Sequence, residues 1–433
     1  MIRGGQLGVS VSLALILSLM AWLTVNLGLA QPMGMAGSGP KEGGRGVLTG
    51  IDVLEQRHFD LLQRADGRKS RIGLVTNQTG VDRSGRRTTD VLAHAPGVEL
   101  SAIFSPEHGI AGSVDTTAIS DSLDRETGVP IYSVYGASDA QRRPPASLLR
   151  KLDAMVFDLQ DAGARFYTYE TTLGYFLEAA AEAGIPLFVL DRPNPIAGLR
   201  VQGPISDPQV CRNANCRFVN YYPLPVRHGM TMGEVARLFN GELHLGAQLT
   251  VIPMKGWQRG DWFDATGLPW VDPSPNLRSL TAATLYPGVA LIEGTNVSVG
   301  RGTGTPFEMV GAPWIKAEEL AAFLNRRALT GVKFVPAAFT PNASRYAQER
   351  CNGVRIVVLN RDRLDPAELG IELASALHRL YASEFKLEQM QDLLANPEVF
   401  GALLAGQDPR RIESAYRVVT ARFETLRKKY LLY

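Results

Sequence analysis

The sequence predicts an α/β protein built on a parallel sheet, followed by a second α+β domain. At 433 residues the chain exceeds the size of one ordinary core, so about two domains are expected. Short apolar runs alternate with helix-length segments from residue 71 onward, and this rhythm indicates βαβ units. The runs are apolar on both faces, as in strands covered by helices on both sides: RIGLVTN, VELSAIF, LDAMVFDLQD and PLFVLDRPNP.

The first domain is predicted to span residues 48–260, and two of its helices have clear patterns. One helix ends at Gly184, just before Pro186, and its apolar residues repeat every three or four positions. The other begins at Thr231, because Glu234 follows in a capping-box pattern. The buried positions of the two helices are predicted to be Leu173, Phe176, Leu177, Ala180, Ala181, Val235, Leu238 and Phe239.

The second domain is predicted to span residues 261–433. It opens with long stretches rich in Gly, Pro and Trp, and loops of this length in a compact protein are usually functional. A helix starts with Asp365 as its N-cap, followed by Pro366 at the first helical position. Further elements are expected as a helix around 316–328, strands near 331–336 and 354–359, and an Arg-rich helix over 410–429.

The first 30 residues have the features of an export signal. Residues 7–30 form an apolar run after a basic start, and Gly28 and Ala30 precede a cleavage site before Gln31. The run is nearly long enough to span a bilayer, so an uncleaved anchor is the alternative and the only expected contact with a membrane. Residues 31–47 then form a flexible leader. We therefore expect an exported protein, periplasmic or extracellular.

The charge balance and the cysteine and histidine content indicate which partners, disulfides and metal sites to expect. Lys and Arg number 45 against 43 Asp and Glu, so the charge balance does not suggest a nucleic-acid partner. In an oxidising compartment Cys211 and Cys216 can pair and leave Cys351 over, whereas three unpaired cysteines are the alternative. The histidines are scattered, and no Cys or His pair apart from this couple has metal-ligand spacing. No metal site is therefore expected.

Polar residues follow each apolar run, and in open parallel sheets ligands bind outside the carboxyl ends of the strands. Each such residue alone could instead cap a loop or form an ion pair. Jointly they are expected to converge, because the ends of parallel strands meet at one edge of the sheet. The residues are Asn77, Gln78, Glu107, His108, Asp158, Gln160, Asp161, Arg165, Asp191, Arg192 and Asn194.

Carboxylates and aromatic residues are the remaining candidates for chemistry. No nucleophile elbow, Walker A motif or zinc-protease motif is present, and no glycine-rich dinucleotide loop follows the first strand, so no cofactor is expected. Glycoside hydrolysis needs a carboxylic acid that protonates the leaving oxygen and usually a second group as base or nucleophile. Glu107 in FSPEHG is the candidate acid, Glu170 and Asp161 are candidates for the second group, and Glu293 is a further one. Aromatic side chains that could face a sugar, or simply pack in the core, are Tyr167, Tyr169, Tyr221, Tyr222, Trp257 and Trp262.

Six strings occur in order between about residue 50 and the C-terminus: GLVTNQTG, FSPEHG, VFDLQDAGARFYTY, LDRPNP, PLPVRHGMTMGE and EGTNVSVGRGT. Together they resemble the NamZ/YbbC-type exo-β-N-acetylmuramidases of bacteria. The resemblance implies an enzyme that removes terminal N-acetylmuramic acid from the non-reducing end of peptidoglycan fragments. It also implies a Rossmann-like N-terminal domain, a C-terminal domain of unusual fold and an active-site cleft between them.

The resemblance also assigns site residues. The glutamate of the family's P-E-H-G motif falls on Glu107. Glu170 is a candidate second group because it lies beside the family's Q-D-x-G-x-R-x-Y-T-Y segment. That segment falls on Gln160, Asp161, Gly163, Arg165, Tyr167, Thr168 and Tyr169.

Muramic acid carries a lactyl carboxylate, so the pocket should contain a cation suited to bidentate anion recognition. Arg165, Arg192 and Arg301 are the candidates, and each could instead form a structural ion pair. The rival hypothesis is an exported protein that binds muropeptides or sugars without cleaving them, which would have no need of a carboxylate at position 107. The other predicted substrate-binding residues are Asn77, His108, Gln160, Tyr167, Tyr169 and Asn194.

Overall fold

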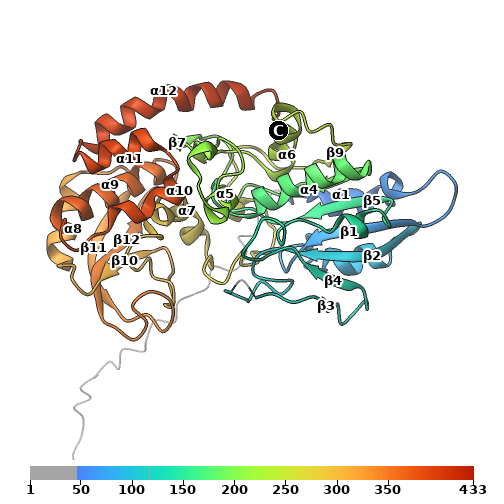
Figure 1. Ribbon diagram of the computed structural model, residues 1–433, viewed down its shortest axis with the longest axis horizontal. Helices are drawn as coiled ribbons and strands as arrows, with labels where there is room; N and C mark the ends of the chain where they lie inside the picture. Colours follow the sequence, from blue (N-terminus) through green and yellow to red (C-terminus); the bar gives the residue numbers. More distant parts are fainter. Residues whose placement is uncertain (1–45, 117) are drawn as a thin grey trace, which may run out of the picture. The chain divides into compact units, whose positions relative to one another are not determined.

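A seven-stranded sheet is the main element of the N-terminal part of the protein (Figure 1). The computed structural model describes residues 46–116 and 118–433, so the predicted signal segment and nearly all of the leader lie outside the described residues. The strand order is β3-β4-β2-β1-β5-β6-β9, and neighbouring strands are parallel except for β3 with β4. The strands are β1 (Ser70–Thr76), β2 (Val98–Ser105), β3 (Ser122–Leu123), β4 (Pro130–Ser133), β5 (Ala154–Asp158), β6 (Leu187–Leu190) and β9 (Leu249–Ile252).

Alternate residues of each central strand enter two separate cores. Met155 and Phe157 of β5 pack in the core that contains α4 (Tyr169–Ala183) and α6 (Met232–Glu242). Ala154 and Val156 pack instead in the core that contains α1 (Gly50–Gln56) and α2 (Thr88–Ala93). Successive side chains of a strand point to opposite faces, so the two cores mark the two faces of the sheet. The predicted parallel sheet with helices on both faces is confirmed.

The predicted helix ends are also confirmed. Gly184 ends α4 with a φ of 66°, a left-handed conformation that glycine adopts without strain. Thr231 caps α6, and Glu234 completes the capping box. The strands β4 and β9 are not predicted from the sequence, because they are only partly buried and lack the continuous apolar run that marks the equally short β6.

A second sheet of three antiparallel strands lies in the C-terminal part, in the order β10-β12-β11. Its strands are β10 (Met309–Ala312), β11 (Val332–Phe339) and β12 (Cys351–Val358). The predicted helices and strands of this part are confirmed, and Asp365 caps α9 through its side chain. The helices here are α7 (Leu280–Val289), α8 (Ala317–Arg326), α9 (Pro366–Leu380), α10 (Gln391–Leu394), α11 (Pro397–Leu404) and α12 (Pro409–Arg427).

One hydrophobic core runs from the first sheet into the C-terminal elements. It contains Phe104 of β2 and also Leu377 of α9. The predicted domain boundary near residue 260 falls in the loop between β9 and α7. The two parts are therefore packed on each other across that loop and not merely linked by it.

A short antiparallel ribbon connects the two parts. It pairs β7 (Gln202–Ile205) with β8 (Pro225–Arg227), and α12 packs against β7. Between its strands lies the short helix α5 (Ala214–Phe218), and α3 (Ala146–Leu149) lies earlier, before β5. The Cys211–Cys216 disulfide forms beside α5 and Cys351 is a buried free thiol, so of the two cysteine alternatives the paired one holds. Within the described ranges, no helix combines the length and apolar character needed to span a membrane.

Candidate active site

Two hydroxyl groups hold Glu107 just beyond the end of β2. Tyr135 donates its phenolic hydroxyl to Oε1 at 2.6 Å, and Thr168 donates its hydroxyl to Oε2 at 2.5 Å. The turn that presents Glu107 is tight, because the Gly109 amide bonds back to the Pro106 carbonyl at 3.0 Å. His108 in this turn has a φ of 71°, a strained value for a residue with a side chain and one that is often found at functional sites. Glu107 is therefore fixed through both carboxyl oxygens and through its backbone.

Tyr169 contacts the backbone of the same turn through its hydroxyl. Its hydroxyl accepts a hydrogen bond from Asn77 Nδ2 at 2.6 Å and lies 3.4 Å from the Glu107 carbonyl oxygen. Burial raises the pKa of Tyr169, and the nearby Glu107 carboxylate raises it further, so the phenol stays protonated. The Tyr167 ring packs edge-on against Tyr169, with 4.8 Å between the centroids. Asn77 and Tyr169 thus support the turn that carries Glu107, and Tyr167 packs against Tyr169.

A second carboxylate, Glu293, lies in the same electrostatic environment. Its Oε1 is 2.9 Å from Arg301 Nη1, and Arg301 Nη2 is 3.7 Å from Asp115. Burial raises the pKa of Glu293; Arg301 opposes this increase, whereas Asp115 and Glu107 add to it. Asp115 also accepts a hydrogen bond from Asn276 at 3.2 Å. Glycoside hydrolysis uses two carboxyl groups, and the ion pair with Arg301 favours the ionised form of Glu293 that a base or nucleophile needs.

The other two predicted carboxylates, Asp161 and Glu170, are buried with His228. The His228 Nε2 atom lies 2.9 Å from Glu170 Oε1 and 3.5 Å from Asp161 Oδ2, and the carboxylate side chains are only 2% and 5% exposed. Such burial keeps both carboxylates away from a sugar at the surface, so neither is placed to act beside Glu107. Burial raises the pKa of Glu170 to about 7.

The neutral His228 ring carries its proton on Nε2, the ring nitrogen that faces these carboxylates. Its Nδ1 atom accepts the Met230 amide proton at 3.1 Å, which places the proton of the neutral ring on Nε2. Burial disfavours the charged ring, but Glu170 and Asp161 outweigh it and raise the pKa of His228 to about 10. If the cluster takes up one more proton, His228 Nδ1 is a poor site for it, because that atom already faces the Met230 N–H. We therefore place the additional proton on Glu170.

The same three residues are the metal-binding candidates of the described chain. One atom from each of Asp161, Glu170 and His228 lies within 4.8 Å of the others. The 2.9 Å contact between Nε2 and Glu170 has the length of a hydrogen bond. Neither atom has a partner of good hydrogen-bond geometry among the described residues, however. A proton shared between Nε2 and Glu170, or a cation held by all three residues, would satisfy these atoms.

Arg165 and Arg192 turn into the protein and not toward the candidate site. Arg165 donates to the carbonyl oxygens of Leu393 and Leu394 at 2.7 and 3.2 Å. Arg192 forms a two-point ion pair with Asp158 at 2.5 and 2.9 Å. Both guanidinium groups therefore have structural partners, and of the three predicted arginines only Arg301 lies with Glu293.

Gln160 and Asn194 also bond within the protein. The Gln160 amide donates to the carbonyls of Asp161 and Pro193 at 2.9 and 2.8 Å. Asn194 donates to the Met230 carbonyl at 2.9 Å and accepts the Ile196 amide at 3.1 Å. Gly163 is required at this point, because a Cβ there would lie 2.5 Å from the Asn194 side chain. These polar residues, predicted to follow the ends of the strands, therefore hold strand ends and loops together.

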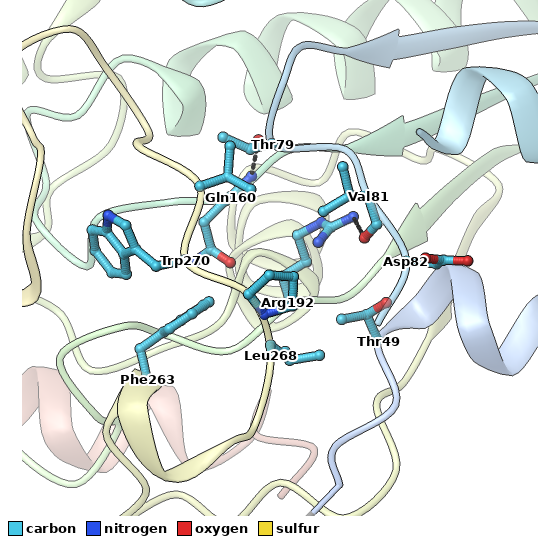
Figure 2. Close-up of a pocket in the computed structure, with 11 residues that line it drawn as sticks. Thr49, Thr79, Val81, Asp82, Gln160, Arg192, Phe263, Leu268 and Trp270 are labelled. Atoms are coloured by element: carbon cyan, nitrogen blue, oxygen red, sulfur yellow. Dashed lines mark hydrogen bonds between the residues drawn. The ribbon is translucent and has the colours of Figure 1, made fainter. Parts of the chain in front are cut away.

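Figure 2 shows a small pocket between Gln160, Arg192 and the loop that carries Phe263 and Trp270. The backbone amide of Gln160 bonds to Thr79, and Arg192 bonds to the Val81 carbonyl at 2.7 Å. The cavity holds about 10 Å³, which is room for a single water molecule. A sugar ring cannot enter, so this pocket is not the substrate site.

Sequence reasoning alone did not find Tyr135 and Asp115, which lie at the candidate site, or His228, which lies in the buried cluster. Tyr135 follows β4, a partly buried strand without an apolar run, so no local pattern indicated it. Asp115 lies in a loop without a local pattern. His228 is the histidine of PLPVRHGMTMGE, so the motif that contains it was the available signal.

The fold and the site together define a class of protein. Glu107 lies just beyond the carboxyl end of β2 and is held by two hydroxyl groups, and Glu293, paired with Arg301, is close enough for the charge of Glu107 to raise its pKa. Two carboxyl groups of this kind are what a carboxylate-based glycosidase uses.

Comparisons with known proteins place the chain within that class. The N-terminal model of the exo-β-N-acetylmuramidase NamZ family matches residues 72–281, and the C-terminal model matches residues 284–433. The chain is 41% identical over 391 residues to the peptidoglycan β-N-acetylmuramidase NamZ of Bacillus subtilis, covering 89% of this chain and 91% of that protein. The chain belongs to the NamZ family.

Solved structures with the same fold come from Bacteroides fragilis. One DUF1343-family protein superposes with a TM-score of 0.81 at 33% identity, covering 90% of this chain and 99% of its own. A second superposes with a TM-score of 0.69 at 30% identity, covering 89% of this chain and 99% of its own. The α/β architecture described above is therefore shared with these structures.

Proposed function

We propose that this protein is an exo-acting glycosidase that releases terminal N-acetylmuramic acid from the non-reducing end of peptidoglycan fragments. The observation that carries the proposal is Glu107, held by Tyr135 and Thr168 at the sheet edge in a member of the NamZ family. Membership of an enzyme family, with a relative that is 41% identical, favours catalysis over the rival muropeptide-binding protein.

In this proposal Glu107 gives its proton to the glycosidic oxygen as the bond to the terminal sugar breaks. The Tyr135 and Thr168 hydroxyls, which donate to its two oxygens, stabilise the carboxylate that remains. Glu293 is the second carboxylate, acting as base or nucleophile, and Arg301 orients it. Glu293 replaces Glu170 and Asp161 in this role because those two are buried with His228.

The first test compares wild type with Glu107→Gln on two substrates. One is a N-acetylmuramyl disaccharide, and the other is para-nitrophenyl N-acetylmuramic acid. General acid catalysis contributes about 10²- to 10⁴-fold, so we expect a loss of that size on the disaccharide. The loss on the nitrophenyl substrate should be smaller, because nitrophenolate leaves without needing a proton.

The alternatives give distinct results. An equal loss on both substrates would assign Glu107 to the base or nucleophile role instead. Binding of the sugar without turnover by the folded wild type would support the binding-protein hypothesis.

We also propose that the protein is exported, on the strength of the apolar run at residues 7–30. Cleavage before Gln31 is expected to release it into the periplasm or the medium. Cell fractionation with N-terminal sequencing of the mature protein tests this, and an intact N-terminus in the membrane fraction would identify the segment as an anchor.

A further inference from the structure

A cavity of about 430 Å³ lies beside the Glu293–Arg301 pair. It is lined by Val297, Ser298, Val299, Ser344 and Arg345 together with that pair. Ligand pockets for small molecules begin at about 300 Å³, so this cavity can take a substituent of a sugar.

Two loops form this cavity, and glycines allow them to approach closely. Gly302 has a φ of 78°, and a Cβ on it would lie 2.4 Å from the Ala343 carbonyl oxygen. The Asn342 amide also donates to the Gly302 carbonyl at 2.8 Å. The loop of residues 341–350 is thereby docked onto the GRGTGT run, which carries Arg301 between two glycines.

The loop of residues 341–350 is held in a strained conformation. Ser344, Tyr346 and Gln348 have φ values of 65°, 58° and 65°, in the left-handed region that residues with side chains rarely adopt. The Tyr346 hydroxyl fixes the loop by donating to the Asn296 carbonyl at 2.8 Å. Strain of this kind is kept where a defined loop geometry has a function, and here the geometry sets Arg345 at the cavity.

Polar groups at the cavity lack partners. Arg301 Nε is buried without a hydrogen-bond partner within the described chain, and Glu293 Oε1 has Arg301 Nη1 at 2.9 Å but no partner of hydrogen-bond geometry. Arg345 is exposed and forms no ion pair with any described residue. Arg301 and Arg345 equal the carboxylates of Glu293 and Asp115 in number, but Arg301 contacts both carboxylates, so Arg345 is the arginine that remains to bind a further anion.

The cavity is also coupled to the catalytic carboxylate. Asp115, which contacts Arg301, belongs to the segment that follows Glu107. The Glu107 carboxylate is among the charges that raise the pKa of Arg301, after Glu293 and Asp115. A group bound here would therefore belong to a sugar whose glycosidic bond lies near Glu107.

We propose that this cavity is a carboxylate subsite in which Arg345, with the unpartnered Nε of Arg301, binds the substituent on the terminal sugar. The inference rests on the proposed muramidase activity. Two sources can supply the carboxylate: the free lactyl group or a peptide attached to it. Arg345 is then a specificity-determining residue, since a planar guanidinium binds carboxylate in two-point fashion.

The test removes the positive charge of Arg345 from the protein and, separately, the carboxylate charge from the substrate. Wild type and Arg345→Ala are assayed on para-nitrophenyl N-acetylmuramic acid, on its lactyl methyl ester, and on the derivative carrying a dipeptide with a free carboxylate. Loss of a charge-assisted hydrogen bond costs about 1.5–3 kcal/mol, so KM should rise roughly 10- to 100-fold on the carboxylate substrates with kcat little changed. The methyl ester should be cleaved equally by both proteins.

Controls separate the outcomes. Arg350→Ala removes another exposed arginine of the same loop that does not line the cavity, and it should behave as wild type. A KM increase confined to the free lactyl substrate, or to the dipeptide substrate, would support the subsite and identify its source. Equal KM values for Arg345→Ala and an active wild type on every substrate would overturn the subsite alone. An inactive wild type would instead refute the proposed activity.

Discussion

Glu107 shows how much of a catalytic residue's setting comes from neighbours that its own motif does not contain. Its hydroxyl partners Tyr135 and Thr168 come from the residues after β4 and from the start of α4. Tyr169 and Asn77 support its backbone from two further segments. FSPEHG therefore supplies the carboxyl group and the strained turn, whereas other strand ends supply the geometry.

For the three candidate arginines, the residue type alone does not indicate which of them lies at the candidate site. Arg165, Arg192 and Arg301 were equal candidates for binding a carboxylate. Arg165 donates to backbone carbonyls and Arg192 pairs with Asp158, so of these three arginines only Arg301 lies with Glu293. A guanidinium group serves either role, and its surroundings alone distinguish them.

At the residue scale, the buried Asp161–Glu170–His228 cluster should make stability depend on pH. Burial raises the pKa of Glu170 from 4.5 to about 7. The carboxylates, outweighing burial, raise the pKa of His228 from 6.5 to about 10. Both shifts mean that the folded protein binds a proton more tightly than the unfolded chain. Because the cluster holds one shared proton, its contribution to stability is lost as pH rises from 6.5, where the unfolded histidine releases its proton, toward about 10.

We expect the unfolding temperature of the wild type to fall between about pH 6 and about pH 9, and to fall less in Glu170→Gln. Thermal melts followed by circular dichroism at several pH values measure this. An identical pH dependence in the two proteins would mean that the cluster does not retain a proton. Addition of a chelator should leave both melts unchanged, as expected for proton sharing and not for a bound ion.

At the scale of elements, the first turn of α4 divides its residues between two sites. Thr168 and Tyr169 reach Glu107, whereas Glu170 faces His228 in the interior. Successive residues of a helix point in directions about 100° apart, so neighbours in sequence serve different surroundings. This is why Glu170, although it follows the motif directly, is not at the candidate site.

The glycine run GRGTGT acts as a packing element. Gly302 combines a φ of 78° with a backbone contact that leaves no room for a Cβ. Gly302→Ala should lower stability by roughly 1–3 kcal/mol and raise KM, because the loop of residues 341–350 has to move. Gly304→Ala is the matched control, since nothing lies within 4 Å of a Cβ there. Denaturant melts and steady-state kinetics of both variants test this; equal behaviour would contradict it.

At the scale of the whole molecule, the strand order places the site. β1 lies between β2, which follows it in sequence, and β5, so the chain reverses direction across the sheet at β1. Ligands of open parallel sheets bind at such a reversal point, outside the strand ends. Asn77 after β1, Glu107 after β2 and Asp161 after β5 are brought together there.

The C-terminus is bonded back onto the first sheet. The Tyr433 hydroxyl donates to Asp191 at 2.7 Å and accepts the Met254 amide at 2.8 Å. Asp191 is fully buried, and burial raises its pKa to about 6. The chain end thus completes the hydrogen bonding of a buried carboxyl group after β6.

Tyr433→Phe should therefore destabilise the protein by about 1–3 kcal/mol, because Asp191 and the Met254 amide each lose a partner. Lys428→Ala, at an exposed position nearby, should have little effect. Equilibrium unfolding in denaturant compares the two variants. A Tyr433→Phe midpoint equal to that of wild type would show that water replaces the hydroxyl.

The sequence by itself determined the parallel sheet, the capped ends of α4, α6 and α9, and Glu107 as the first candidate. These depend on apolar patterns, caps and a motif that lie within a few residues of one another. Only the tertiary structure decided that Glu293 pairs with Arg301, that Glu170 contacts His228 and that Arg165 donates to backbone carbonyls. That choice depends on partners distant in sequence, such as the Leu393 carbonyl that occupies Arg165 from 228 residues away. The physical reason is that burial and charge neighbours are set by packing, which local sequence does not contain.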